Sequence, residues 1–222
     1  MFKAILLDID NTLYEYEAQH QKALEQVLNY LEKELSISRE VALPALDQAK
    51  VYVKQNNPEK ACSHNRLLYM QYLCENLSLP ALDHSMTLYN HYWDTFLETL
   101  ELSSGAMAFL QRYQATPICL VTDLTAHIQF RKVQRLGLSR WTDFMVTSEE
   151  AGIEKPHPFM FQLALHKLDM RPEDVCMVGD NYKKDILGAK RLGIHAYWLT
   201  NNENHVQEEG ITCISSLEDI TW

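Results

Sequence analysis

The run from Phe2 to Leu7 is short, mostly apolar and followed at once by two carboxylates, Asp8 and Asp10. Such a run suits a buried parallel strand better than a helix, which needs at least about ten residues. Asp8 then stands at the carboxyl end of the strand, and in open α/β sheets ligands bind in the crevice outside those ends. Asn11 follows in a tight turn, where Gly or Asn is favoured because the backbone needs a positive φ. Taken alone, the two acids fit an ordinary turn as well as a site.

The size and composition indicate a soluble globular protein. At 222 residues the chain is long enough for one good core and a smaller second unit. Its hydrophobic content of 46% and charged content of 23% are ordinary for a folded domain. The net charge of -10 argues against nucleic acid and anionic membranes as partners, since both attract a basic face.

The cysteines and the N-terminus suggest a cytoplasmic location. The 5 cysteines are odd in number and widely spaced without a CxxC pair, so neither a disulfide framework nor a zinc ribbon is indicated. The N-terminal apolar run is cut at Asp8 and lacks a signal-peptide cleavage pattern. No stretch approaches the ~18 apolar residues of a membrane helix. We therefore expect a protein of the reducing cytoplasm.

Residues 15–100 lack any β-type run, whereas the flanking sequence alternates strand and helix patterns. Apolar residues at three-and-four spacing predict helices over 17–35, 66–77 and 86–102, and a weaker one over 39–55 that Pro44 interrupts. The aromatic residues of this region are expected to pack in its core. We predict an α/β core domain, 1–14 with 101–222, and an inserted all-helical domain, 15–100.

The remaining chain predicts a Rossmann-like parallel sheet with helices on both faces. After the first strand, strands are expected at 118–121, 144–146, 175–178 and 196–199, and helices at 105–113, 126–136, 159–167 and 185–192. Gly137 should end the helix that begins at residue 126 with a left-handed cap. The tail, 201–222, holds one short apolar run, Ile211 to Ile214, to which we assign no function.

Polar side chains follow several of these strands in the same sense. They are Asp8 and Asp10 after the first strand, Thr122 after the second, Asp180 and Asp185 after the fourth, and Lys155 on the loop before a helix. In a parallel sheet with right-handed crossovers these strand ends lie along one edge. Four carboxylates, a lysine and a hydroxyl are therefore expected in one pocket.

Such a pocket implies a divalent cation, because four neighbouring carboxylates repel one another unless a cation neutralises them. Oxygen ligands without His or Cys favour Mg2+ over zinc, with Asp8, Asp10, Asp180 and Asp185 as the candidates. Mg2+ sites often include a substrate phosphate oxygen, and Lys155 and Thr122 would bind the remaining ones.

At this point the chain resembles the haloacid dehalogenase superfamily of aspartate-nucleophile hydrolases. The segment Asp8–Leu13 looks like its first motif, Thr122 its second, Lys155 its third and Gly179–Asp185 its fourth. The order and spacing match across nearly the whole chain, and a helical insertion after the first motif resembles the C1 cap of that superfamily.

The resemblance implies a role for each residue. Asp8 would attack phosphorus to give an aspartyl-phosphate, and Asp10 would protonate the leaving oxygen and then activate water. Asp8, the backbone carbonyl of Asp10, and Asp180 would hold Mg2+, with Asp185 ligating directly or through water. Lys155 would stabilise the nucleophile and the phosphoryl charge.

Substrate contacts are expected at Thr122, Asp123 and Asn11, two of which depart from the superfamily pattern. Asn11 replaces the more usual Gly but tolerates the same backbone region. Asp123 stands where Asn is frequent, and its alternative role is to cap the helix that follows.

The expected activity is Mg2+-dependent hydrolysis of a small phosphomonoester, either a nucleotide monophosphate or a sugar or organic-acid phosphate. The carboxylate at Asp10 favours a phosphatase or mutase, because the dehalogenases of the superfamily lack an acid there. A phosphomutase is the alternative, and a dehalogenase or a non-catalytic binding module is less expected. The protein would act as a monomer or a homodimer.

Overall fold

Six parallel strands form one sheet in the residues that this computed structural model describes, 1–201 and 208–222. The strands are β1 (Ala4–Leu7), β2 (Ile118–Thr122), β3 (Phe144–Thr147), β4 (Val175–Gly179), β5 (His195–Leu199) and β6 (Ile211–Ile214). The spatial order is β3-β2-β1-β4-β5-β6. The predicted parallel α/β fold is confirmed, and β6 forms at the apolar run for which no strand was predicted. Residues 202–207 of the C-terminal tail lie outside the described residues.

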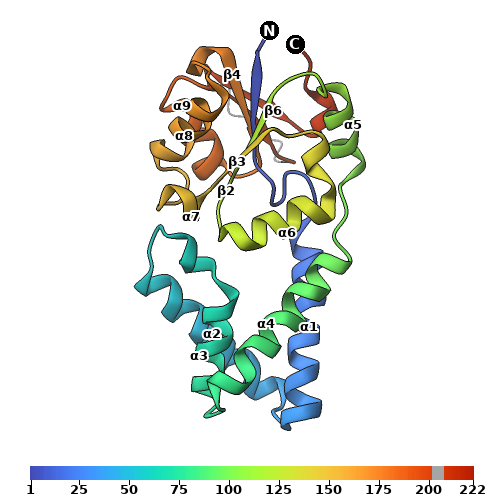
Figure 1. Cartoon of the computed structure of the whole chain (residues 1–222), viewed down its shortest axis with the longest axis vertical. Coiled ribbons are helices and arrows are strands. Elements are labelled where there is room, and N and C mark those ends of the chain that lie inside the picture. Colours follow the sequence, from blue (N-terminus) through green and yellow to red (C-terminus); the bar gives the residue numbers. More distant parts are fainter. Residues whose placement is uncertain (202–207) are drawn as a thin grey trace. The chain divides into compact units, whose positions relative to one another are not determined.

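Strand β1 is central, with β2 on one side and β4 on the other (Figure 1). Leu7 pairs with Leu120 of β2 and with Val178 of β4, so the three strands end at nearly the same level. All four residues of β1 are fully buried, as the apolar run predicts. The strand order reverses at β1, which makes its carboxyl end the switch point where α/β proteins bind ligands.

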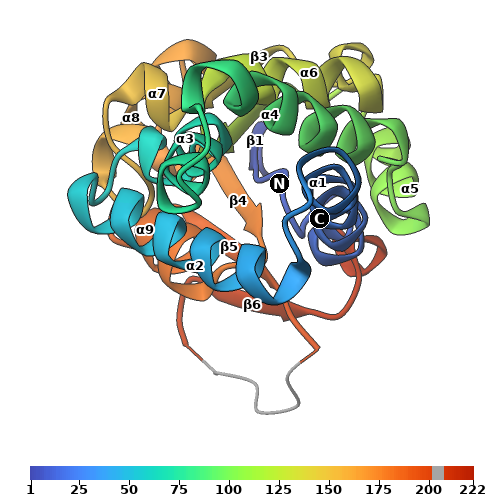
Figure 2. The ribbon, with the colours of Figure 1, turned by 90° about the horizontal axis from the view of Figure 1, so that it is seen from below.

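Helices cover both faces of the sheet. The α-helices of this part are α5 (Ser104–Arg112), α6 (Ala126–Leu136), α7 (Ser148–Ala151), α8 (Pro158–Leu168) and α9 (Leu187–Lys190). Short 3-10 turns are η2 (Leu138–Arg140), η3 (Pro172–Asp174) and η5 (Leu217–Asp219). Helices α7, α8 and α9 lie on one side, and α5 and α6 on the other (Figures 1 and 2). Gly137 ends α6 with a φ of 64°, so the expected left-handed cap is confirmed.

The predicted helix over 185–192 is wrong at both ends, since the α-helix α9 spans only Leu187–Lys190. Residues Tyr182–Ile186 form a π-helix, η4, and the α-helix starts only at Leu187. The Asn181 side chain accepts a hydrogen bond from the Lys184 amide, and the Asn181 carbonyl accepts from the Asp185 and Ile186 amides. These bonds to Asn181 widen the first turn, which brings the Asp185 side chain back toward β4.

The chain divides into two units, Met1–Glu15 with Glu101–Trp222, and Tyr16–Leu100. The second unit consists of α1 (Tyr16–Leu35), α2 (Arg39–Asn56), η1 (Ala61–His64), α3 (Arg66–Asn76) and α4 (Ala81–Glu98). Its core holds Tyr92, Trp93 and Phe96 of α4, each at most 1% exposed, as the packing interpretation predicts. Pro44 lies inside α2 without ending it. None of the helices in the described ranges has the length and apolar character needed to cross a bilayer.

Candidate active site

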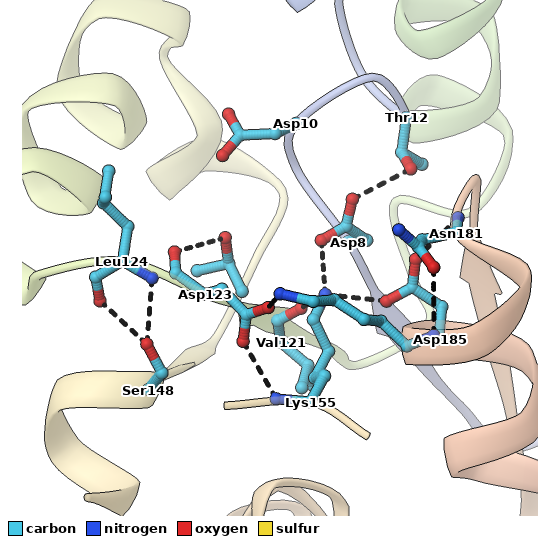
Figure 3. A network of polar contacts seen from close by, with 12 residues as sticks. Asp8, Asp10, Thr12, Val121, Asp123, Leu124, Ser148, Lys155, Asn181 and Asp185 are labelled. Atoms are coloured by element: carbon cyan, nitrogen blue, oxygen red, sulfur yellow. Dashed lines mark hydrogen bonds and ion pairs between the residues drawn. The ribbon is translucent and has the colours of Figure 1, made fainter. Parts of the chain in front are cut away.

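Asp8 follows β1 directly and is 5% exposed. Both of its carboxylate oxygens are held, since Lys155 Nζ donates to Oδ1 at 2.6 Å and Thr12 Oγ1 donates to Oδ2 at 3.0 Å (Figure 3). These contacts come from the turn after β1 and from the loop before α8, and they fix the direction of the carboxylate. A buried carboxylate in this position can act as a nucleophile.

Lys155 joins three groups at the strand ends. Besides Asp8, its Nζ lies 2.7 Å from Asp185 Oδ1 and donates to the Val121 carbonyl at 2.8 Å. Burial disfavours the charged form of the amine, but the charges of Asp185 and Asp8 outweigh it and raise the pKa of Lys155 well above its usual value. Lys155 is therefore a fixed cation beside the nucleophile.

A cluster of carboxylates forms between β1 and β4. Oxygens of Asp8, Asp180 and Asp185 lie within 4.8 Å of one another. Asp185 reaches this place because Gly179 has no side chain, and a Cβ there would lie 2.6 Å from the Asp185 carboxyl carbon. Asp185 Oδ2 accepts a hydrogen bond from the Asn181 amide at 3.0 Å, and Trp198 Nε1 donates to the Asp180 carbonyl at 2.9 Å. Hydrogen bonds thus fix the segment after β4 at both Asp180 and Asp185.

The three carboxylates of the cluster carry more negative charge than Lys155 alone can neutralise. Burial, together with the charges of Asp185 and Asp10, raises the pKa of Asp8 to about 7, although Lys155 opposes the change. Burial and the charge of Asp8 raise the pKa of Asp180 to about 6, and burial also raises that of Asp185. The one lysine that pairs with Asp185 Oδ1, Lys155, is shared with Asp8. Three acids around one point, all oxygen donors, fit a hard divalent cation.

Asp10 lies apart from this cluster, although it is only two residues from Asp8. Lys132 Nζ donates to its Oδ1 at 2.6 Å, the Tyr14 hydroxyl also donates to Oδ1, and Gln129 Nε2 lies 3.4 Å from its Oδ2. Burial would raise the pKa of Asp10, but the Lys132 charge and these hydrogen bonds lower it overall. The side chain of Asp10 is not among the candidate metal-ligand atoms that cluster in the described residues. Its predicted metal contact through the backbone carbonyl stays a prediction.

Sequence analysis missed Gln129 and Lys132 of α6, both 0% exposed. Gln129 Nε2 also donates to Thr122 Oγ1 at 2.8 Å and to the Asp123 carbonyl at 2.7 Å. One signal was available, because two polar residues occupy the inward stripe of an amphipathic helix between Ile128 and Leu136. Such residues need buried polar partners.

The alternative role of Asp123 as a helix cap is wrong. The N-cap of α6 is Thr125, and the first free amide of the helix, that of Ala126, is bonded to Glu149 instead. The Asp123 carboxylate accepts from Lys184 Nζ at 2.7 Å and from the Lys155 amide at 3.0 Å. Its oxygens thus link the loop after β2 to η4 and to the loop before α8. The substrate contact expected at Asp123 stays a prediction.

Two non-glycine residues at the site have left-handed backbone. Asn11 has a φ of 63° and is exposed, as expected for the turn after the first motif. Leu124 has a φ of 96°, which is strained for a bulky side chain, and its amide and carbonyl both bond the Ser148 hydroxyl (Figure 3). The loop beside Thr122 is therefore held in a defined shape by β3 and α7.

Comparisons with known proteins agree with this geometry. A family model described as haloacid dehalogenase-like hydrolase matches residues 2–193. A ribulose-1,5-bisphosphate 5-phosphatase from Halopiger xanaduensis is 35% identical over 91% of this chain and 87% of its own length. A glyceraldehyde 3-phosphate phosphatase from Methanothermobacter thermautotrophicus is 28% identical over 100% of this chain and 97% of its own.

Solved structures share the fold. A 2-haloacid dehalogenase from Pseudomonas syringae aligns with a TM-score of 0.77 at 20% identity, over 98% of this chain and 96% of that one. A phosphatase from Thermococcus onnurineus aligns with a TM-score of 0.72 at 23% identity, over 97% and 94%. The fold therefore recurs in proteins of low sequence identity to this chain.

Proposed function

The chain belongs to the haloacid dehalogenase-like hydrolase family and is a phosphomonoester hydrolase, and from this premise we propose that it hydrolyses a small sugar phosphate through an aspartyl-phosphate on Asp8. One observation carries the proposal. The Asp8 carboxylate is oriented by Lys155 and Thr12, and a second carboxylate, Asp10, is held apart from it by separate partners. Because the two carboxylates have different hydrogen-bond and charge partners, one can act as the nucleophile and the other can transfer protons.

The first step transfers the phosphoryl group to the enzyme. Asp8 attacks phosphorus, the bond from phosphorus to the sugar oxygen breaks, and the leaving oxygen takes a proton from Asp10. In the second step Asp10 removes a proton from water, the water oxygen bonds to phosphorus, and the bond to Asp8 breaks. Inorganic phosphate and the free sugar are the products, and Asp8 and Asp10 return to their starting states.

Lys155 and the acid cluster support both steps. Lys155 binds Asp8 and supplies positive charge where the phosphoryl group arrives. We assign Asp8, Asp180 and Asp185 to a Mg2+ ion, which supplies charge neutralisation and a ligand position for a phosphate oxygen when bound. Thr122, with Asn11 and Asp123, is the proposed contact for the remaining phosphate oxygens.

The sugar-phosphate class is the part of the proposal that the relatives support. Both full-length relatives described above are named for phosphate esters of small sugars. We assign catalysis to the α/β unit and the choice of substrate to the helical unit.

The decisive experiment measures inorganic phosphate released from a panel of sugar, nucleotide and organic-acid phosphates, with Mg2+ and with chelator. We expect Mg2+-dependent release from sugar phosphates and no release by Asp8→Asn, whose amide cannot attack phosphorus. Substantial release by Asp8→Asn would rule out the aspartyl-phosphate. Appearance of an isomeric sugar phosphate in place of free phosphate would indicate a mutase.

A further inference from the structure

Helix α6 carries two polar side chains where the fold needs apolar ones. Gln129 and Lys132 are one turn apart on its inward face and both are 0% exposed, although Lys is among the residues least often buried. Burying an ammonium group is costly unless a partner of opposite charge is fixed beside it. A methionine would fill the same volume at less cost, so packing does not explain Lys132.

The partner of Lys132 is Asp10, which three residues hold. Lys132 and Tyr14 donate to Oδ1, and Gln129 Nε2 lies 3.4 Å from Oδ2 while it bonds Thr122 Oγ1 and the Asp123 carbonyl more closely. The Lys132 ammonium also lies 5.9 Å from the centre of the Tyr14 ring. The carboxylate is thus held from α6 and from the turn after β1.

The protein contains two separate buried lysine–aspartate systems at the ends of its strands. Lys155 forms ion pairs with Asp8 and Asp185, whereas Lys132 forms an ion pair with Asp10. The Asp10 side chain keeps 30% of its surface exposed despite its partner being fully buried. One side of this carboxyl is therefore anchored, and the other is open to a reacting group.

We propose that Lys132, supported by Gln129, is a positioning residue that holds the Asp10 carboxyl in place for proton exchange with the leaving oxygen and with water. The inference rests on the proposed phosphatase function. Lys132 touches no reacting atom in this scheme, and it acts only through Asp10. General acid–base catalysis contributes roughly 100- to 10,000-fold and depends on a carboxyl within hydrogen-bond reach of its target.

The test uses substrates whose leaving groups differ in their need for a proton. A sugar phosphate expels a strongly basic alkoxide, whereas p-nitrophenyl phosphate expels a stable phenolate that leaves without an acid. For Lys132→Met we expect kcat/KM on the sugar phosphate to fall about 100-fold, and kcat/KM on p-nitrophenyl phosphate to fall less than about fivefold. Lys132→Arg keeps the charge and the donors, and should recover at least part of the sugar-phosphate rate.

Further measurements separate positioning from structural damage. Mg2+ affinity by calorimetry should be unchanged in Lys132→Met, because Lys132 pairs with the Asp10 carboxylate, which lies outside the Asp8, Asp180 and Asp185 cluster. The matched control is Lys167→Met, which removes an ion pair with Glu150 away from the site and should alter neither substrate. In an Asp10→Asn background, Lys132→Met should cause less than about a twofold further change, since the group that it positions is already lost.

Equal losses on both substrates, or full sugar-phosphate activity in Lys132→Met, would overturn the inference. If Lys132→Met does not fold, the same comparison is made with Lys132→Gln, which retains a donor. Failure of the proposed function is recognised separately, because the wild-type protein would then release phosphate from neither substrate.

Discussion

Two carboxylates separated by a single residue have opposite electrostatic surroundings. The pKa of Asp8 is raised to about 7 by burial and by neighbouring acids, whereas the Lys132 charge and the hydrogen bonds from Tyr14 and Gln129 lower the pKa of Asp10. The strand and the turn direct the two side chains to different neighbours. The lowered pKa of Asp10 favours its ionised form, which suits the removal of a proton from water, so Asp10 must first take up a proton against the Lys132 charge before it protonates the leaving oxygen. The nucleophile then depends on added positive charge to be ionised near neutral pH.

Gly179 is the residue at which a single methyl group should disturb the acid cluster. A Cβ at this position would lie 2.6 Å from the Asp185 carboxyl carbon, so Gly179→Ala must displace that side chain. We expect the Kd for Mg2+, measured by titration calorimetry, to rise at least about tenfold, in line with losses on changing groups that orient ligands. Gly105→Ala is the control, since its Cβ would meet Ser216 Oγ at 3.3 Å and Glu218 Cγ at 4.0 Å, both away from the acid cluster. Wild-type Mg2+ affinity in Gly179→Ala would show that Asp185 is not held against β4.

One ion-pair network joins η4 to the loop after β2 and to the loop before α8. Lys184 of η4 binds Asp123 after β2 at 2.7 Å and Glu154, which precedes α8, at 3.1 Å. Glu154 is 6% exposed, so removal of Lys184 leaves a buried carboxylate without this partner. The network fixes the backbone on which Thr122 and Lys155 stand.

Lys184→Met should therefore affect both stability and activity. We expect Tm to fall by several degrees, because removing one partner of a buried ion pair costs about 3 kcal/mol and each kcal/mol lowers Tm by roughly 2 to 4 °C at this size. We also expect kcat/KM to fall about tenfold through loosened positioning. Scanning calorimetry and phosphate release measure the two effects. Lys190→Met, which breaks an exposed pair with Glu208, should change neither, and an equal change in both variants would contradict the prediction.

The helical unit contains a histidine that should make its stability sensitive to acid. Burial and the nearby Arg66 charge lower the pKa of His20 to about 4, and its Nδ1 lies 2.7 Å from the Tyr92 hydroxyl. An unfolded histidine has a pKa of about 6.5, so as pH falls from 6.5 toward 4 the unfolded chain takes up the proton first. Stability from neutral His20 is thus complete above pH 6.5 and is lost between 6.5 and 4.

His20→Gln should reduce this acid sensitivity. Between pH 7.5 and 5.0 we expect Tm to fall less in the variant than in the wild-type protein, as measured by thermal unfolding followed by circular dichroism. The exposed His91 of α4 provides the control, because His91→Gln should leave the wild-type difference unchanged. A pH dependence in His20→Gln identical to that of the wild-type protein would refute the assignment.

For the whole molecule, cation binding at the acid cluster should couple to folding. Asp8, Asp180 and Asp185 repel one another without a cation, and they come together only in the folded chain. Mg2+ at about 100 times its Kd should add about 2.7 kcal/mol to the free energy of unfolding and raise Tm by roughly 5 to 10 °C. Chelator should remove both the stabilisation and turnover. Asp180→Asn is expected to lose most of the shift, and a full shift in that variant would place the cation elsewhere.

Five of the six strands and the convergence of the acids could be predicted from the amino-acid sequence. Short apolar runs predict strands locally, and parallel topology then brings Asp8, Thr122 and Asp180 to one edge whatever the details of packing. The turn at Asn11 and the cap at Gly137 were also predictable, because each depends on the φ of a single residue.

The pairing of polar groups across the site depends on the tertiary fold and could not be predicted. The contact of Lys132 with Asp10 spans 122 residues, and that of Lys184 with Asp123 spans 61, so no local pattern encodes them. The same is true of β6, whose four residues become a strand only beside β5, and of the π-turn that returns Asp185 to Gly179. A local preference fixes an element, whereas the partner of a buried charge depends on which elements the completed fold brings into contact.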